Sequence, residues 1–199
     1  MTAETVLQNV LMEIGLDIPD AQLSGDSYDI RQLRAFMNAA GQDIARRAEW
    51  SRLSVDWTVA GGLSAVDLPD DFFEMAEQGA VRINTSGFHP IRGVVAPEQW
   101  EFLSARASTQ PYYHLKGGQL LFAPALPADG ARVRYVSQNW VQGRSTVDQN
   151  GDTILIPERL VEKGTVWRWK RQKGLAYDDC LAEFEADLIA EIKADRGHA

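Results

Sequence analysis

Residues 112–122 read YYHLKGGQLLF, and this stretch decides the β part of the fold. Two short runs of strand-forming residues, 112–115 and 119–122, lie on either side of Lys116-Gly117-Gly118. Adjacent glycines suit a tight hairpin turn because they tolerate the positive φ angles that such turns need. The stretch therefore predicts an antiparallel hairpin.

Longer strands are expected before and after this hairpin. Val55, Trp57 and Val59 alternate with polar residues, which is the pattern of a half-buried strand. Residues 131–136 form another expected strand, with Val133 and Tyr135 on one face. Gly61-Gly62 is expected to turn the chain into a strand over 63–68, which completes a hairpin with the first strand.

Shorter elements fill the rest of the middle third of the chain. Pro69-Asp70-Asp71 is expected to close the hairpin and to start a short helical turn through Phe72, Phe73 and Met75. Short strands are expected at 81–84 and 90–95, and a short helix begins at Pro97, since proline suits the first turn of a helix. The middle third is therefore predicted to be a compact antiparallel β unit.

The two ends of the chain have helical periodicity. One helix is expected over 4–14, with Gly15 as its stop, and a second runs from an N-cap at Asp26 or Ser27 to about Trp50. Two more are expected, from about 158 to 173 and from about 177 to the C-terminal region. Their apolar residues are spaced three and four apart, as in amphipathic helices. The residues on these faces are Val6, Leu7, Val10, Leu11 and Ile14; Ile30, Leu33, Met37, Ala40 and Ile44; Leu160, Val161, Gly164, Trp167 and Arg171; Tyr177, Leu181, Phe184, Leu188 and Ile192.

The order of these elements predicts an α+β fold. Terminal helices are expected to form one bundle, because each has an apolar stripe that must be covered. Residues 1–53 supply the first helices, 54–156 the inserted small antiparallel β unit, and 157–199 the C-terminal helices.

Composition limits the class of protein. Apolar residues make up 45% of the 199 residues and charged residues 24%, as in globular proteins. No apolar run is long enough for a membrane-spanning helix, and the N-terminus lacks the features of a signal peptide. A single cysteine, Cys180, excludes an internal disulfide. The net charge of −8 argues against a general nucleic-acid coat but leaves room for a local basic patch.

Metal-binding patterns are weak in this sequence. His89, His114 and His198 are far apart, and there is no cysteine pair, so no zinc spacing exists. Residues 148–152 resemble the start of a calcium loop. However, its sixth position is Thr153 instead of glycine, and its twelfth is Arg159 instead of glutamate. We interpret this stretch as a polar turn and expect no metal.

Catalytic and cofactor motifs are also missing. The paired glycines lack the lysine and hydroxyl residue of a phosphate-binding loop, and no Gly-x-Ser-x-Gly is present. Cys180 lies in an acidic stretch, which disfavours a thiolate. Asp70-Asp71 and Asp178-Asp179 are typical of helix N-termini. We expect neither a cofactor nor an enzymatic activity.

Charge is unevenly distributed over the last two helices. Residues 158–174 have a net charge of +4, and residues 175–199 a net charge of −5. The stretch Trp167-Arg168-Trp169-Lys170-Arg171-Gln172-Lys173 interleaves basic and aromatic residues, which can hold phosphates and stack on bases. Arg168, Lys170, Arg171 and Lys173 are therefore candidates for contact with DNA or a neighbouring subunit. The favoured alternative is a helix with core tryptophans and charges that pair with the acidic last helix.

Four stretches together point to a known family. They are AEW at 48–50, DLPDDFF at 67–73, LLFAPALP at 120–127 with Val133 to Tyr135 after it, and DTILIPERL at 152–160 with KGLAY at 173–177. Their order resembles that of the head–tail adaptor proteins, also called connector or head-completion proteins, of tailed bacteriophages and related gene-transfer particles. None of these stretches is a catalytic signature.

The resemblance implies a structural role in the virion. Such proteins form a ring, usually of twelve copies, beneath the portal, where they extend the DNA channel and receive the next tail component. The implied partners are the portal ring, neighbouring subunits and a downstream stopper or tail protein. Packaged DNA would pass through the lumen without specific binding, and no membrane is involved.

The resemblance also implies a location and a docking element. The protein would be made in the bacterial host cytoplasm and reside in the virion neck. In relatives the C-terminal helix commonly reaches into the portal, which here makes the following residues candidates for portal docking: Tyr177, Asp178, Asp179, Glu183, Glu185, Asp187 and Glu191. The alternative function is a DNA-binding module that uses residues 167–173.

Overall fold

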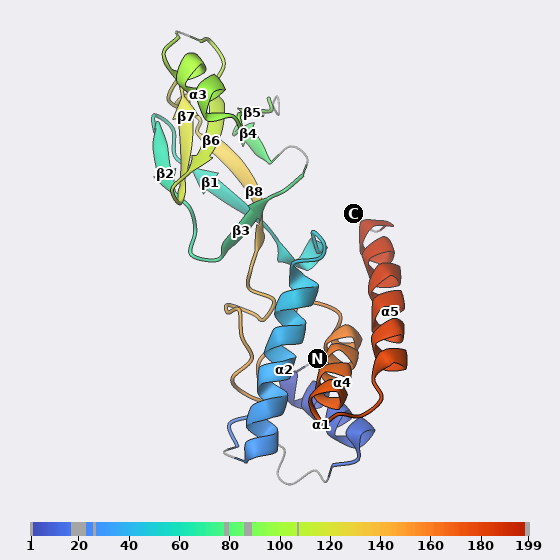
Figure 1. Cartoon of the computed structure of the whole chain (residues 1–199). Coiled ribbons are helices and arrows are strands. Elements are labelled where there is room, and N and C mark those ends of the chain that lie inside the picture. The colour runs from blue at the N-terminus through green and yellow to red at the C-terminus, as the bar shows by residue number, and fades with distance from the viewer. Residues whose placement is uncertain are drawn as a thin grey trace. The chain divides into compact units, whose positions relative to one another are not determined.

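A computed structural model describes residues 2–16, 23–25, 27–77, 80–85, 89–106 and 108–197. The fold is α+β, as expected, with helices from both ends of the chain and strands from its middle (Figure 1). Two compact units divide the chain: a helical unit, Met1–Leu53 with Gln138–Ala199, and a β unit, Ser54–Ser137.

The N-terminal helices begin and end close to where the sequence predicts. Helix α1 spans Ala3–Ile14 and ends at Gly15, whose φ of 70° is the left-handed conformation that glycine adopts most easily. Helix α2 spans Tyr28–Ala45, and the Ser27 hydroxyl accepts a hydrogen bond from the Ile30 amide at its start. The alternative N-cap, Asp26, lies outside the described residues.

Helix α2 ends five residues earlier than predicted, at Ala45. Trp50 folds back on the helix end, where its indole Nε1 donates a hydrogen bond of 2.9 Å to the Ile44 carbonyl oxygen. This bond satisfies one of the carbonyl groups that a helix C-terminus leaves without a partner. A short 3₁₀ turn, Ser51–Leu53, follows.

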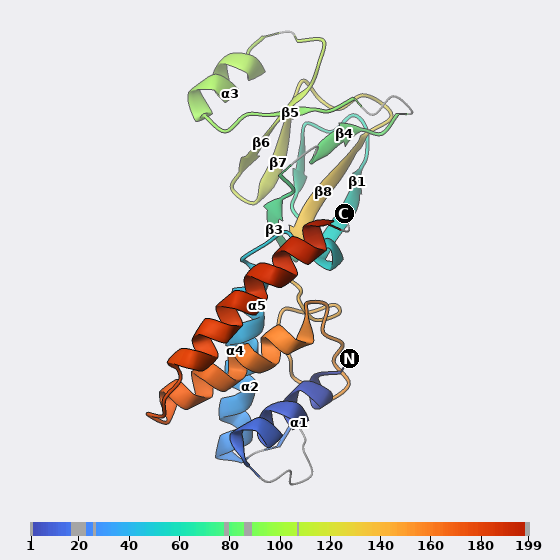
Figure 2. The ribbon, with the colours of Figure 1, turned by 90° about the vertical axis from the view of Figure 1, so that its right-hand side faces the viewer.

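The C-terminal helices complete the bundle. Helix α4 spans Glu158–Gln172 and packs against α1 and α2, while α5, Asp178–Gly197, packs along α4 (Figure 2). All five predicted core residues of α2 are buried. On α5, Phe184 and Leu188 are buried, whereas Leu181 and Ile192 are only partly covered.

Residues 138–157 belong to the helical unit, whereas the sequence pattern predicts that 138–156 are part of the β unit. Trp140 and Val147 are fully buried. Asn38 on α2 accepts a hydrogen bond from the Val147 amide and donates one to its carbonyl oxygen. The Ala3 amide at the start of α1 donates to the Asp152 carbonyl oxygen. These contacts join residues far apart in sequence, so local patterns do not reveal them.

The first sheet of the β unit is built around strand β8, Ala131–Ser137. Strand β1, Ser54–Val59, pairs with one edge of β8, and β3, Phe72–Met75, and β4, Val81–Ile83, pair with the other. All of these pairings are antiparallel. The predicted face of Val133 and Tyr135 is buried.

The second sheet contains the predicted hairpin. Its strand order is β2, Ala65–Asp67; β7, Gln119–Ala123; β6, Tyr112–Lys116; and β5, Arg92–Gly93. Gly117 and Gly118 at the hairpin turn have φ angles of 60° and 80°. Strand β5 pairs with β6 in parallel, so the β unit is mixed and not purely antiparallel as expected. Helix α3, Pro97–Ser104, starts at the predicted proline.

Two details of the predicted strand order are wrong. Strand β2 pairs with β7 and not with β1, because the chain crosses to the second sheet after Gly61. At this crossing the Gly62 amide donates a hydrogen bond to the Leu126 carbonyl oxygen. Residues 72–75 form strand β3 and not a helical turn. The Asp71 carboxylate accepts hydrogen bonds from Tyr135 and Ser137 on β8 and thereby holds this segment beside β8.

The two sheets enclose the core of the β unit. Its buried members come from both sheets and their connections: Val59, Ala80, Val81, Ile91, Leu120, Phe122, Leu126, Ala131 and Val133.

Within the described part of the chain, no helix is long and apolar enough to span a membrane.

Candidate functional site

The tryptophans of the basic segment are in the interior of the helical unit. Trp167 and Trp169 are 8% and 9% exposed. Trp167 contacts the rings of Tyr177 and Phe184, with centroids 6.5 and 6.4 Å away. Because both tryptophans are buried, neither ring presents a free face on which a base could stack.

Arg168 is held inside the helical unit. Its side chain is 11% exposed, its Nη2 lies 2.9 Å from Asp43 Oδ2 on α2, and its Nη1 donates to the Gly164 carbonyl oxygen. Burial lowers the pKa of Arg168, and the Asp43 carboxylate opposes this effect. We conclude that Arg168 joins α4 to α2.

The other three candidate basic residues also have contacts within the chain. Lys173 lies 3.4 Å from Asp29, and Lys170 donates to the Cys180 sulfur at 3.0 Å, a contact that raises the Lys170 pKa. The Arg171 guanidinium lies 5.0 Å from the centre of the Trp167 ring. The basic segment is therefore mainly a packing surface.

The basic residues of α4 and of its C-cap, Lys173, pair with two helices, whereas the charge pattern of the sequence predicts pairing with the last helix only. Lys163 lies 2.8 Å from Asp187 and 3.3 Å from Glu183, and Arg159 lies 3.5 Å from Asp187, all on α5. Arg168 and Lys173 instead pair with α2. The sequence does not distinguish these partners, because each pair joins segments far apart in the chain.

Lys163 and Asp187 shift each other's ionisation. Hydrogen bonding to Asp187 raises the pKa of Lys163, and the same contact holds the pKa of Asp187 below its ordinary value. Glu185, which precedes Asp187 on α5, pairs with Arg47 at 2.8 Å. Three of the predicted docking residues, Glu183, Glu185 and Asp187, thus fasten α5 to its own unit.

The remaining docking candidates are placed differently. Tyr177 is half-buried against Trp167. Asp178, Asp179 and Glu191 are exposed, and none of them has an ion-pair partner among the described residues. These three carboxylates of α5 are open to another molecule.

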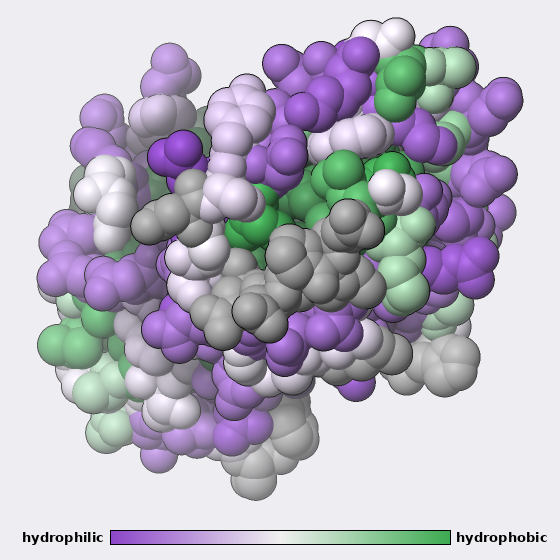
Figure 3. Space-filling view, turned by 90° about the horizontal axis from the view of Figure 1, so that it is seen from below, coloured by the Kyte–Doolittle hydropathy of each residue, from purple (hydrophilic) through white to green (hydrophobic). Residues whose placement is uncertain are grey.

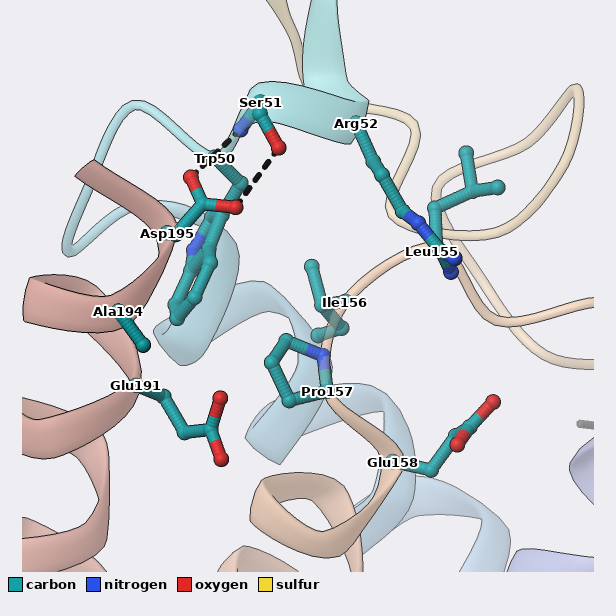
Figure 4. A pocket seen from close by; sticks show the side chains of 10 residues that line it. All are labelled: Trp50, Ser51, Arg52, Leu155, Ile156, Pro157, Glu158, Glu191, Ala194 and Asp195. Carbon is teal, nitrogen blue, oxygen red and sulfur yellow. Dashed lines mark hydrogen bonds between the residues drawn. The ribbon is translucent and has the colours of Figure 1, made fainter. Parts of the chain in front are cut away.

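A pocket of about 350 Å³ lies at the C-terminal end of α5 (Figure 4). Glu191 and Ala194 line it from α5, with Trp50 to Arg52 and residues 155–158 on the other sides. Both Asp195 oxygens accept hydrogen bonds from Ser51, one from its amide and one from its hydroxyl. The last turns of α5 are therefore fastened to the segment that follows α2.

The loop that resembles a calcium site uses its carboxylate internally. Asp152 accepts hydrogen bonds from the amides of Asp148 and Gln149 and lies 3.5 Å from Arg144. Asn150 accepts a hydrogen bond from the Leu23 amide. Among the described residues, no group of three or more histidine, cysteine or acidic side chains could hold a metal ion.

Two of the three histidines are among the described residues, and neither belongs to a group that could hold a metal ion. His114 is buried on β6, where its ring stacks on Trp100 and its Nδ1 lies 2.6 Å from the Val94 carbonyl oxygen. His89 is exposed in the β unit, and His198 lies outside the described residues.

Most of the surface seen from below is hydrophilic, and the hydrophobic residues form a few separate patches (Figure 3). Large apolar side chains exposed on the helical unit include Met12, Tyr28, Leu175 and Ile189. The candidate site is thus a set of charged helix faces and not an apolar cleft.

A family model described as SU10 adaptor protein matches residues 1–199, the full length of the chain. The chain belongs to the SU10 adaptor protein family. This finding confirms the resemblance to phage head–tail adaptors. No curated protein matches the chain.

Membership of the SU10 adaptor protein family gives the charged faces a context. The chain is a structural adaptor of a bacteriophage particle, a component of the virion that contacts other head and tail proteins. In this adaptor, sequence patterns correctly identified the basic and acidic helices. They did not reveal that Asp29, Asp43 and Arg47 form ion pairs with the charged residues of these helices.

Proposed function

We propose that this adaptor forms a ring, of about twelve copies, beneath the portal of the virion neck. The ring extends the DNA channel and receives the next tail component, either a stopper or a tail protein. Its role is structural and needs no catalytic step. Membership of the SU10 adaptor protein family supports the general role, and the open carboxylates of α5 support the mode of docking.

The observation that carries the docking proposal is the division of acidic residues on α5. Glu183, Glu185 and Asp187 pair with basic residues of the helical unit, while Asp178, Asp179 and Glu191 remain exposed. Paired carboxylates stabilise the helix in place, and open ones are available to basic residues of a portal ring. Docking would then use the two ends of the acidic stretch, Asp178-Asp179 and Glu191.

Ring formation requires two different surfaces on each subunit, because neighbours in a cyclic assembly meet head to tail. Opposite charges on such surfaces would favour the correct partner and orientation. Assembly on a portal template would also prevent rings of free subunits from competing with docked ones.

The test is the native mass of the purified chain, alone and after addition of the portal ring from the same particle. We expect capture of about twelve copies per portal ring. An unchanged mass with an unoccupied portal would contradict the proposal.

Charge reversal tests the docking surface directly. Asp178→Lys, Asp179→Lys and Glu191→Lys together are expected to abolish capture while the chain stays folded, with a modest loss of melting temperature because Asp178 and Asp179 lie in the first turn of α5. Glu98→Lys with Glu101→Lys, which are exposed on α3, form the control and should leave capture unchanged. Equal capture of all three proteins would rule out docking through these carboxylates.

A further inference from the structure

Helix α3 carries large apolar residues, yet it is not packed into the core of the β unit. Trp100, Phe102 and Leu103 lie on it, and none of its residues is buried. Val95, two residues before the helix, is 91% exposed. The helix lies beside strand β6 of the second sheet (Figure 2). Apolar side chains between α3 and β6 are therefore open to another molecule.

A pocket of about 330 Å³ lies between α3 and β6. Its volume is at the lower end of the range for ligand pockets, roughly 300–1,000 Å³. Four residues form its apolar walls: Val95, Pro97, Trp100 and Leu115. Walls of this kind favour an occupant with an apolar body, such as an aromatic ring.

His114 on β6 supplies a hydrogen-bond acceptor to this pocket. The side chain is only 7% exposed, and its Nδ1 lies 2.6 Å from the Val94 carbonyl oxygen. Because a carbonyl oxygen only accepts hydrogen bonds, Nδ1 carries the proton, and Nε2 of the neutral ring is an acceptor. Nε2 has no hydrogen-bond partner among the described residues, and it is not sealed from solvent. Since the ring lines the pocket, this unused acceptor is available to an occupant.

The His114 ring is held in place before any occupant arrives. It stacks on Trp100, with the ring centroids 5.3 Å apart and the planes 22° apart. Val94, which accepts the Nδ1 proton, is itself fixed to β6, because its amide donates to the Tyr113 carbonyl oxygen at 2.8 Å. Binding therefore does not have to order the acceptor, and this lowers the entropic cost of association.

We propose that this pocket, the α3–β6 pocket, binds a tyrosine side chain presented by another protein of the particle. The phenol ring packs against the apolar walls, and its hydroxyl donates a hydrogen bond to His114 Nε2. Tyrosine combines an apolar body with a polar tip, which matches apolar walls with one inner acceptor. The inference goes beyond the proposed function, which places portal docking on α5 of the helical unit.

Other side chains fit the α3–β6 pocket less well. Serine and threonine donate a hydrogen bond but are too small to cover the walls, and phenylalanine has no donor for Nε2. Glu101 and Lys116 also line the pocket, and both are exposed. Their opposite charges leave no net attraction for a cation, and burial of a lysine or arginine charge costs more than burial of a phenol hydroxyl.

The experiment is a titration of the isotope-labelled full-length chain with p-cresol, the side-chain analogue of tyrosine. The indole N–H signal of Trp100 reports binding, and the Trp100→Phe variant identifies that signal among those of the six tryptophans. We expect a saturable shift with a Kd of about 1 mM, as the affinities of small fragments allow. In p-methylanisole a methyl group replaces the hydroxyl proton, so it should bind about threefold to tenfold more weakly.

Variants of the pocket locate the binding site. Leu115→Thr removes part of a wall and should weaken p-cresol binding about threefold to tenfold. Leu63→Thr is the matched control, because both leucines are 38% exposed and Leu63 does not line the pocket. It should bind p-cresol within about twofold of the parent chain. His114→Phe should abolish the preference for p-cresol over p-methylanisole. If His114→Phe does not fold, the two probes on the parent chain still test the hydrogen bond.

A tripeptide, Gly-Tyr-Gly with blocked ends, tests whether the site accepts a tyrosine within a protein segment. It should displace p-cresol, and Gly-Phe-Gly should do so about threefold to tenfold more weakly. The inference is overturned if p-methylanisole binds as tightly as p-cresol, if Gly-Tyr-Gly does not displace p-cresol, or if butylguanidinium binds more tightly than p-cresol.

A second copy of the chain is the remaining occupant to test, because Tyr28 is exposed on the helical unit. Sedimentation of the parent chain, Tyr28→Ala and Leu115→Thr measures self-association at the concentrations of the titration. We expect the same mass for all three proteins. Self-association of the parent that both variants abolish would assign the α3–β6 pocket to a second copy and overturn the inference.

Discussion

Gly41 on α2 lies against the ring of Trp140, and a Cβ atom at this position would come within 2.4 to 2.5 Å of three ring atoms. The ring is fully buried, and its Nε1 donates to the Ser145 carbonyl oxygen, so it has little freedom to move. Glycine at this position therefore allows the segment after β8 to pack on α2.

Gly41→Ala is expected to lower the free energy of unfolding by about 1–3 kcal/mol, because overpacking outweighs the gain in helix propensity. Urea unfolding followed by tryptophan fluorescence measures the change. Gly197→Ala is the matched control, since nothing lies within 4 Å of its added Cβ, and it should leave stability unchanged or slightly higher. A stability of Gly41→Ala equal to that of the control would show that Trp140 is not tightly packed.

Arg132 offers a second test at the scale of one residue. Because it lies opposite Arg82, Arg132→Gln should leave the free energy of unfolding unchanged or raise it by up to about 1 kcal/mol. Arg134→Gln should lower it slightly, because it loses the pair with Asp56. Thermal unfolding of both variants measures the difference, and a clear loss of stability in Arg132→Gln would mean that folding needs this arginine.

At the scale of the helices, α5 is fastened to α4 by two buried apolar side chains and by ion pairs. Phe184 and Leu188 supply the apolar contact, and Lys163 with Asp187 supplies the shortest ion pair between the two helices. The folded-state pKa of Asp187 is lowered and that of Lys163 is raised, so both groups stabilise the folded state at neutral pH.

This pair predicts how the stability of the helical unit depends on pH. The contribution of Asp187 is complete above its ordinary pKa of 3.8 and is lost as the pH falls through its lower folded-state value. The contribution of Lys163 is complete below 10.5 and is lost as the pH rises through its higher folded-state value. Asp187→Asn should thus be less stable than the parent at pH 7, by less than about 1 kcal/mol, and equal to it in strong acid. Chemical unfolding at both pH values tests this, and a difference that persists in strong acid would argue against the assignment.

At the scale of the molecule, the chain leaves the helical unit after Leu53 and returns to it at Gln138. The chain enters the β unit on β1 and leaves it on β8, and these two strands are paired. Ser54 on β1 is in register with Val136 on β8. Cα atoms of directly paired residues are about 5 Å apart, so a very short linker can span this gap.

Replacement of residues 55–135 by two glycines is therefore expected to leave the helical unit folded. Circular dichroism should show a strongly helical spectrum and a single cooperative unfolding transition. A longer deletion that ends at residue 147 removes Trp140 and part of the contact with Asn38, and it should unfold. If both proteins unfold without cooperativity, the helical unit needs the β unit for its stability.

Local patterns predicted a large part of this fold. The helices, their apolar stripes and the hairpin at Gly117-Gly118 were all evident, because helical periodicity and turn chemistry depend on residues only a few positions apart. The opposite net charges of the last two helices were equally evident from the sequence. For these features, the amino-acid sequence by itself was sufficient.

The tertiary structure alone decided which segments meet. It pairs β2 with β7, places 138–157 with the helices, ends α2 at Ala45, and divides the charges of α4 between α2 and α5. It also sets the register that places Arg82 beside Arg132. Each of these features depends on contacts between residues far apart in the chain, whose relative positions follow from packing of the whole core and not from any local pattern.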